Sequence, residues 1–181
     1  SGCDDYIRKP FELKELLIRI QTILKREFSH KSESINITET ITFNSISGEL
    51  KSGDELGNYE CLIFGTSTWY DGELQDDWDS YLNHLKKADL SGKKVAFFGL
   101  GDQEGYGSDF VSGMRIIYDV ALMQGAIAVG RWEDTGYSYD DSAAVIGGKF
   151  LGLALDEDNQ SELSDGRIEE WCEQLKMEFG V

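Results

Sequence analysis

The sequence predicts an α/β fold, a doubly wound parallel sheet in three α/β/α layers. Continuous apolar runs, typical of strands that are buried on both faces, occupy residues 61–65, 95–99, 126–129 and 151–155. Stripes of apolar residues at helical spacing separate or follow these runs. Strands that alternate with helices in this order pair in parallel, and the helices then cover both faces of the sheet.

Three apolar stripes predict the helices of this part of the chain. In chain order, the stripes consist of Trp78, Tyr81, Leu82 and Leu85; of Phe110, Met114, Ile117, Ala121 and Leu122; and of Ile168, Trp171, Cys172 and Leu175. We expect Ser108 or Asp109 to cap the second helix, and the last helix to begin near Ser164. The loops that follow residues 65 and 99 then lie at the carboxyl ends of the strands, where such sheets bind ligands.

Length and composition indicate one globular domain of ordinary size. The chain has 181 residues, of which 40% are hydrophobic, and its mean hydropathy is −0.36. No apolar run approaches the roughly 20 residues that span a bilayer, and no leader sequence is visible, so we expect a cytoplasmic protein without a membrane anchor. Three cysteines without a CxxC pair, and two isolated histidines, favour reduced thiols over a disulfide framework or a metal site.

The charge distribution divides the chain near residue 52. Residues 1–52 carry eight acidic and eight basic side chains, whereas the remainder carries 26 acidic and nine basic ones, hence the whole net charge of −17. An acidic field of this size repels phosphate backbones, which argues against nucleic acid, and it favours basic protein partners through electrostatic steering. We expect a single domain over residues 1–181 that is composed of two segments, 1–55 and 56–181.

The first segment is predicted to form a strand at residues 5–8, a helix that opens at Pro10, and a β-hairpin around residues 35–43. Its string GCDDYIRKPFELKELLIRIQTILKR resembles the end of a response-regulator receiver domain, and ITFNSISGELKSGDE resembles the opening strands of the winged-helix output domain of that family. Only Lys9 matches a functional residue of a receiver. The phosphoacceptor aspartate and the DNA-reading helix are not matched, so neither phosphorelay nor DNA binding is implied.

Two loops at the predicted ligand edge combine aromatic residues with glycines. The first places Trp69 and Tyr70 after a buried strand, and the second places Tyr106 near Gly99 and Gly101. Glycine lets backbone N–H groups approach a ligand closely, and a large ring in a loop must pack on protein or on ligand. For each ring by itself, packing on protein is the stronger alternative. Two such loops on two buried parallel strands, however, suit a flat ring held between aromatic faces.

The strings LIFGTSTWYDGELQDDW and VAFFGLGDQEGYG resemble the two isoalloxazine-binding loops of flavodoxins. The tail that begins GRWEDTGYSYDDSAAVIGGKF resembles the long-chain subclass, whose last strand is interrupted by an inserted segment. The resemblance covers about 120 residues, implies a flavodoxin-like fold, and would place Trp69 and Tyr106 on the faces of the flavin ring. The residues implied in cofactor binding are Thr66, Ser67, Thr68, Trp69, Tyr70, Asp71, Gly72, Gly99, Leu100, Gly101, Asp102, Gly105, Tyr106 and Asp158.

The function that this resemblance implies is one-electron transfer at low potential by non-covalently bound FMN, in a monomer that serves basic redox partner proteins and has no catalytic residues. The alternative is a recombined or engineered chimera that keeps the fold with little cofactor binding. A signalling module that dimerises through residues 13–24, or a flavin-dependent enzyme such as a quinone reductase, has less support.

Flavodoxins hold the FMN phosphate in a loop rich in Ser, Thr and Gly at a helix N-terminus. No such loop precedes Tyr59 in this sequence, where the segment that resembles a receiver stands instead. Each charge-assisted bond to a phosphate contributes on the order of 1.5–3 kcal/mol. We therefore expect weak binding of FMN, with little preference for FMN over riboflavin.

Overall fold

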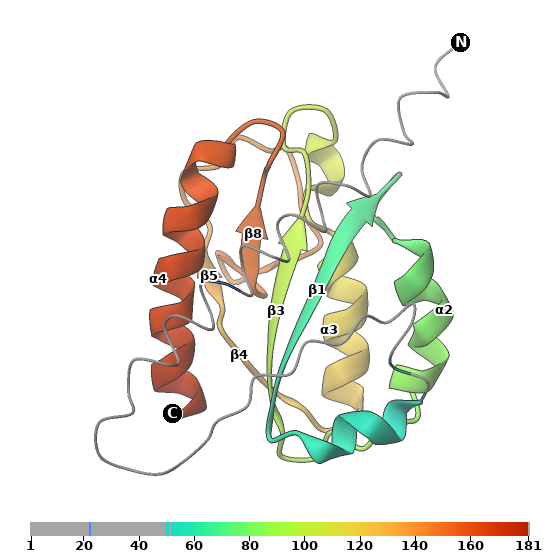
Figure 1. Cartoon of the computed structure of the whole chain (residues 1–181). Coiled ribbons are helices and arrows are strands. Elements are labelled where there is room, and N and C mark those ends of the chain that lie inside the picture. The colour runs from blue at the N-terminus through green and yellow to red at the C-terminus, as the bar shows by residue number, and fades with distance from the viewer. Residues whose placement is uncertain (1–21, 23–49, 51, 181) are drawn as a thin grey trace.

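A parallel sheet lies at the centre of the structure, between helices on its two faces (Figure 1). The structure is a computed structural model that describes residues 52–180, together with Thr22 and Leu50. The central pair of strands is β1 (Cys61–Trp69) and β3 (Lys94–Leu100), which run parallel from Cys61↔Lys94 to Ser67↔Leu100. The predicted α/β fold in three layers is confirmed.

The apolar runs form strands because their side chains are buried on both faces of the sheet. Val95, Ala96 and Phe97 are completely buried, and Phe64 of β1 packs edge-on against Phe97, with 6.0 Å between ring centroids. Gly65 pairs with Phe98, whose ring lies where a Cβ on Gly65 would be. A side chain at position 65 would therefore displace the Phe98 ring from its place in the core.

One side of β3 is shared by two short strands. β4 (Ile127–Val129) pairs with Lys94–Ala96, and β8 (Leu153–Leu155) pairs with Phe98–Leu100. The two runs that the sequence predicted as separate strands thus lie in tandem along one neighbour. This arrangement confirms the predicted interruption of the last strand by an inserted segment.

The helices cover opposite faces of the sheet with separate apolar cores. α2 (Asp76–Leu85) and α3 (Gly113–Met123) bury most of their predicted stripes in one core, but Leu122 of the α3 stripe is 38% exposed, and Phe110 lies before that helix. α4 (Ser161–Phe179) buries its predicted stripe, Ile168, Trp171, Cys172 and Leu175, in the other core. Two predicted boundaries were wrong. α3 begins at Gly113 because Ser108 and Asp109 belong to a short 3-10 helix, η3 (Gly107–Asp109), and α4 begins one turn before Ser164.

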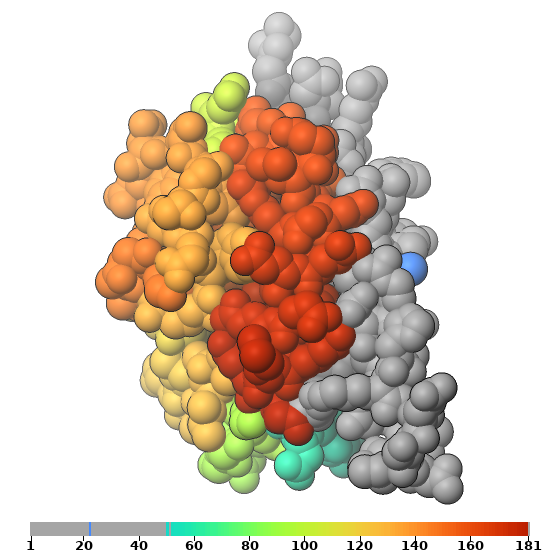
Figure 2. Space-filling view, turned by 90° about the vertical axis from the view of Figure 1, so that its left-hand side faces the viewer, coloured from blue at the N-terminus to red at the C-terminus, as the bar shows by residue number. Residues whose placement is uncertain are grey.

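The inserted segment forms a small antiparallel sheet that the sequence analysis did not predict. It contains β5 (Trp132–Glu133), β6 (Val145–Ile146) and β7 (Lys149–Phe150), in the order β5-β7-β6. Strands of two residues are too short to produce a recognisable alternation of apolar and polar residues. Figure 2 shows this segment, in yellow to orange, beside α4, in red, on one face of the molecule.

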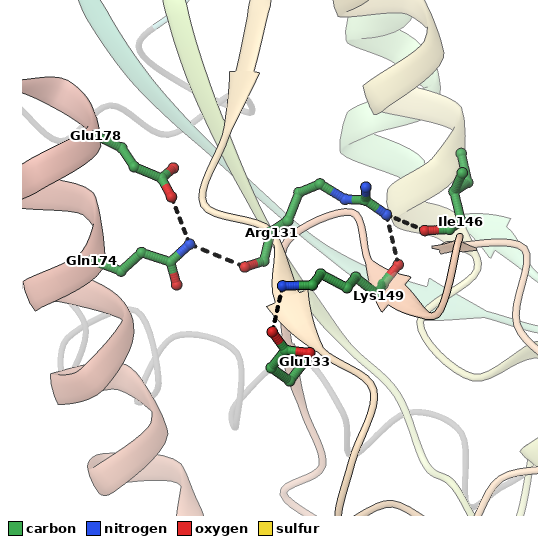
Figure 3. Close-up of polar contacts among 6 residues, drawn as sticks. All are labelled: Arg131, Glu133, Ile146, Lys149, Gln174 and Glu178. Atoms are coloured by element: carbon green, nitrogen blue, oxygen red, sulfur yellow. Dashed lines mark hydrogen bonds and ion pairs between the residues drawn. The ribbon is translucent and has the colours of Figure 1, made fainter.

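Polar contacts join the small sheet to itself and to α4 (Figure 3). The Arg131 guanidinium donates to the carbonyls of Ile146 and Lys149, and Lys149 forms an ion pair with Glu133. The Gln174 carboxamide on α4 donates to the Arg131 carbonyl at 3.1 Å. The insertion is therefore held against α4 by its first residues.

The N-terminal predictions lie outside the described residues, including the strand at 5–8, the helix after Pro10, the hairpin, Lys9 and Cys3. The first complete element that the structure describes is the 3-10 helix η2 (Gly53–Asn58), which leads into β1. Cys172 is buried and Cys61 is half-buried, and His84 is exposed on α2. Within residues 52–180, no helix combines the length and the apolar character required to cross a bilayer.

Two glycines provide a test of this packing. A Cβ on Gly152 would lie 2.0 Å from the Phe97 carbonyl oxygen, a backbone atom that cannot move away cheaply, whereas nothing lies within 4 Å of a Cβ on Gly166 in α4. We expect Gly152→Ala to lower the free energy of unfolding by about 3 kcal/mol or more, and Gly166→Ala to raise it by about 0.8–1 kcal/mol. Urea unfolding of the two variants measures both effects, and a tolerated alanine at 152 would contradict the close approach of β3 to the β7–β8 link.

Candidate functional site

The two loops singled out from the sequence leave the sheet at the same edge. β1 and β3 are adjacent and parallel, and Ser67 pairs with Leu100, so the residues that follow these positions emerge side by side. β8 ends at the same edge because Leu155 also pairs with Leu100. This edge, at the carboxyl ends of the strands, is where open α/β sheets bind ligands.

The first loop is a tight hairpin between β1 and β2 (Glu73–Leu74). Trp69 pairs with Glu73, which leaves Tyr70, Asp71 and Gly72 as the turn. Tyr70 has a φ of 45°, a left-handed conformation that costs a residue other than glycine about 1 kcal/mol. Its ring is 55% exposed and meets the half-buried Trp69 ring edge-on, with 6.3 Å between centroids. The turn therefore presents two aromatic rings at the ligand edge.

Residues outside the turn hold this hairpin in place. The Gln75 side chain accepts from the Ser67 N–H, and the Thr68 hydroxyl accepts from the Gly113 N–H, both at 3.1 Å. Thr66 is completely buried, and its hydroxyl donates to the Ser67 carbonyl. Because the Thr66 side chain is not exposed, Thr66 could contact a ligand only through its backbone groups.

The second loop, residues 101–107, is folded around Asp102. Asp102 Oδ1 accepts from the N–H groups of Glu104 and Gly105, at 3.2 and 2.7 Å, and the Asp102 carbonyl accepts from the Tyr106 N–H at 3.0 Å. A Cβ on Gly105 would lie 2.4 Å from Asp102 Oδ2. A side chain at position 105 would therefore push against the Asp102 carboxylate, around which the turn that carries the half-buried Tyr106 is folded.

The other predicted residues of the second loop face the interior. A Cβ on Gly99 would meet Val111 and Met114 at 3.2–3.3 Å, and one on Gly101 would lie 2.8 Å from the Phe110 ring. Leu100 is only 8% exposed and packs in the core beneath α4. The absence of a side chain at 99 and 101 therefore allows close packing of β3 on the segment before α3.

A third segment, the link between β8 and α4, completes the edge. The carboxylates of Asp102, Asp156 and Asp158 lie together, with one oxygen of each within 4.8 Å of the others. Asp158, which the sequence analysis included, is exposed, whereas Asp156 is completely buried. Asp156 and Asn159 were missed, although Asp and Asn just before a helix are typical N-terminal hydrogen-bonding residues. Their hydrogen bonds reach Gln103 and Asp102 in the second loop, and the three carboxylates place negative charge at this edge.

Aromatic packing fixes the insertion behind the second loop. The centroids of the Phe110 and Phe150 rings lie 5.9 Å apart, and each lies 5.2–5.6 Å from the rings of Tyr137 and Tyr139. The Tyr137 hydroxyl donates to the Ala154 carbonyl at 2.7 Å and accepts from Trp132 Nε1 at 3.0 Å. Burial raises the pKa of Tyr137 to about 12. Burial, together with a hydrogen bond to Asp134, also raises the pKa of Tyr139. These tyrosines stay neutral and serve to anchor the insertion.

The geometry of the edge fits a planar aromatic ligand. Trp69 and Tyr106 are half-buried on neighbouring loops that are each fixed by hydrogen bonds. The exposed part of each ring can bury further apolar surface against a ligand. The nearby backbone of Tyr70, Asp71 and Gly72 offers N–H and carbonyl groups to a ring edge.

A family model described as Flavodoxin matches residues 39–171. The chain belongs to the flavodoxin family. It is 48% identical to a flavodoxin of Nostoc sp. (strain PCC 7120) over 127 residues, which are 70% of this chain and 75% of that protein. It is also 45% identical to a flavodoxin of Trichodesmium erythraeum over 144 residues, 79% of this chain and 83% of the relative.

Among solved structures, the chain is similar to a flavodoxin of Fusobacterium nucleatum bound to flavin mononucleotide. The TM-score is 0.79 at 34% sequence identity, and the match covers 92% of this chain and 91% of that one. The resemblance to flavodoxins is thus confirmed. The resemblance of residues 1–55 to a response regulator, and the division of the domain at 55/56, stay predictions.

The buried tyrosine of the insertion predicts a loss of stability in alkali. Between pH 10 and 12 an unfolded chain releases the Tyr137 proton while the folded chain keeps it, so the free energy of unfolding falls as pH rises. Tyr137→Phe should remove about 1–3 kcal/mol of this fall. Urea unfolding at pH 8 gives the cost of the two lost hydrogen bonds, and repeated measurements up to pH 12 give the slope. Identical slopes for the two proteins would contradict the burial of the hydroxyl.

Proposed function

We propose that this flavodoxin is a low-potential one-electron carrier that uses non-covalently bound FMN. The observation that carries the proposal is the pair of half-buried rings, Trp69 and Tyr106, on two fixed loops at the carboxyl edge of the sheet. The similarity to a flavodoxin bound to flavin mononucleotide supports the same cofactor. The alternative of a chimera with little cofactor binding has no support from the comparisons.

In this proposal, Trp69 and Tyr106 pack on the two faces of the flavin ring. The backbone groups of Thr68, Tyr70 and Gly72 line one side of the ring, and those of Asp102 and Gly105 line the other. When it is bound, the flavin supplies the electron transfer, while the protein binds it, excludes water and sets the local field. No residue of the chain needs to act as an acid, a base or a nucleophile.

The local field favours a low potential. Three carboxylates gather at the β8–α4 link and the second loop, and Asp71, Glu73 and Asp109 lie on or beside the first hairpin. Negative charges that surround a site oppose the addition of further negative charge to a group bound there, and they do so more strongly where water is excluded. The acidic surface also suits basic redox partners, which the field would attract over a distance.

The finer features of the proposal concern the first segment and the cellular setting. The residues before Tyr59 offer no loop rich in Ser, Thr and Gly at a predicted helix N-terminus to hold a phosphate, so we propose that the 181-residue chain binds FMN weakly and with little preference over riboflavin. We further propose a cytoplasmic, monomeric carrier that forms one composite domain from residues 1–55 and 56–181.

Titration of the flavin-free protein tests this proposal through the quenching of flavin fluorescence. We expect binding of both FMN and riboflavin, with Kd values within about tenfold of each other. Trp69→Ala and Tyr106→Ala should each raise both Kd values by about tenfold or more, because stacking of an aromatic side chain on a base contributes about 1–3 kcal/mol.

Two further variants serve as controls for this titration. Trp69→Phe keeps an aromatic face and should lose less affinity than Trp69→Ala. Met177→Ala, at an exposed position on α4, should bind as the unchanged protein does. The absence of binding by the unchanged protein would overturn the proposed function, and a preference for FMN of several hundredfold would show that the chain has a phosphate site after all.

A further inference from the structure

Asp156 is a completely buried carboxylate that the cofactor contacts proposed above do not use. Its Oδ1 accepts from the backbone N–H groups of Asp158 and Asn159, at 3.1 and 3.0 Å, and from the Asn159 carboxamide at 3.1 Å. Its Oδ2 accepts from the same carboxamide at 2.9 Å and from the Gln103 N–H at 3.1 Å. A buried carboxylate with several N–H donors is a strong and geometrically exact anchor.

This anchor joins parts of the chain that are far apart in sequence. Asp156 and Asn159 belong to the β8–α4 link, whereas Gln103 belongs to the second loop, 53 residues earlier. Gln103 is itself buried, and its side-chain oxygen accepts from the Ser138 N–H in the insertion at 2.6 Å. The second loop is thus held from one side by the link and from the other by the insertion.

Asn159 carries the constraint from Asp156 to the turn that places Tyr106. Its carboxamide nitrogen donates to Asp102 Oδ1 at 2.9 Å as well as to Asp156. The same Asp102 oxygen accepts from the Gly105 N–H at 2.7 Å. The chain of contacts therefore runs from the buried carboxylate, through one carboxamide, to the oxygen around which residues 102–106 fold.

We infer that Asp156 is a positioning residue that fixes the second loop, and with it Tyr106, in the conformation that receives the cofactor ring. The inference rests on the proposed function for the identity of the ligand, whereas the fixing of the loop stands on the contacts alone. Asp156 acts through Asn159 and Gln103 and does not itself touch the ring. An asparagine at 156 would offer one acceptor and two donors to a set of groups that are all donors, so it could not replace the carboxylate.

The test compares Asp156→Asn with Glu162→Gln, a matched control that removes one negative charge from an exposed position six residues after Asp156. Hydrogen exchange of the Gly105 and Tyr106 amides is measured in flavin-free protein. Both amides donate to Asp102 and not to Asp156, so they report on the loop rather than on the altered side chain. We expect their exchange to accelerate about tenfold or more in Asp156→Asn and to stay unchanged in Glu162→Gln.

The affinities for FMN and for riboflavin form the second measurement. When a loop adopts its binding conformation only part of the time, the apparent Kd rises by the inverse of that fraction for every ligand that uses the loop. We expect Asp156→Asn to raise both Kd values by the same factor, about tenfold or more. Asn159→Ser, which removes the bridge without altering the buried charge, should act in the same direction, and it replaces Asp156→Asn if that variant does not fold.

Unchanged exchange at Gly105 and Tyr106 in these variants would overturn the inference. A rise in the Kd for FMN without a rise for riboflavin would also overturn it, because Asp156 would then act on the phosphate and not on the ring. If the unchanged protein binds neither flavin, the proposed function fails, while the exchange measurement still decides whether Asp156 fixes the loop.

Discussion

The seven-residue parallel pairing of β1 with β3 is the constraint on which the rest of the structure depends. It places Gly65 beside Phe98, whose ring occupies the space that a side chain at position 65 would need. It also sets the register that brings Trp69 and the loop of Tyr106 to one edge of the sheet. A shift of β1 by one residue along β3 would turn the side chains of β1 to the opposite faces of the sheet and move Gly65 away from Phe98.

Much of the rigidity of this edge comes from contacts behind it rather than at it. Val111, a buried residue between the second loop and α3, has a φ of 50°, which is strained for a β-branched side chain. The strain persists because Phe110 and the Val111 backbone close on Gly101, which has no side chain to keep them away. The aromatic cluster of the insertion then packs on Phe110. The loop that carries Tyr106 is thus supported by core packing as well as by the hydrogen bonds of Asp102.

The sequence predicted the layers, the long helices and the two aromatic loops, because these features depend on local patterns of apolar residues and on recognisable motifs. The sequence implied an interrupted last strand only through its resemblance to the long-chain subclass, because the pairing of residues 127–129 and 153–155 with one neighbour leaves no trace in such short apolar runs. It missed Asp156, Gln103 and Asn159 for a related reason. Their contacts join positions more than 50 residues apart, and a polar residue beside a helix N-terminus looks the same whether it caps the helix or holds another loop.

The tandem placement of β4 and β8 has a topological consequence. The chain leaves the main sheet opposite Ala96 and returns opposite Phe98, only two residues further along the same strand. The segment between Val129 and Leu153 therefore forms an insertion whose two ends lie close together. Such a module could vary in length or content over evolution without disturbing the strand register, because loop closure costs little more for a longer excursion. Two positions of the insertion are constrained by hydrogen bonds to the rest of the protein. The Ser138 N–H donates to the Gln103 side chain, and the Tyr137 hydroxyl donates to the Ala154 carbonyl.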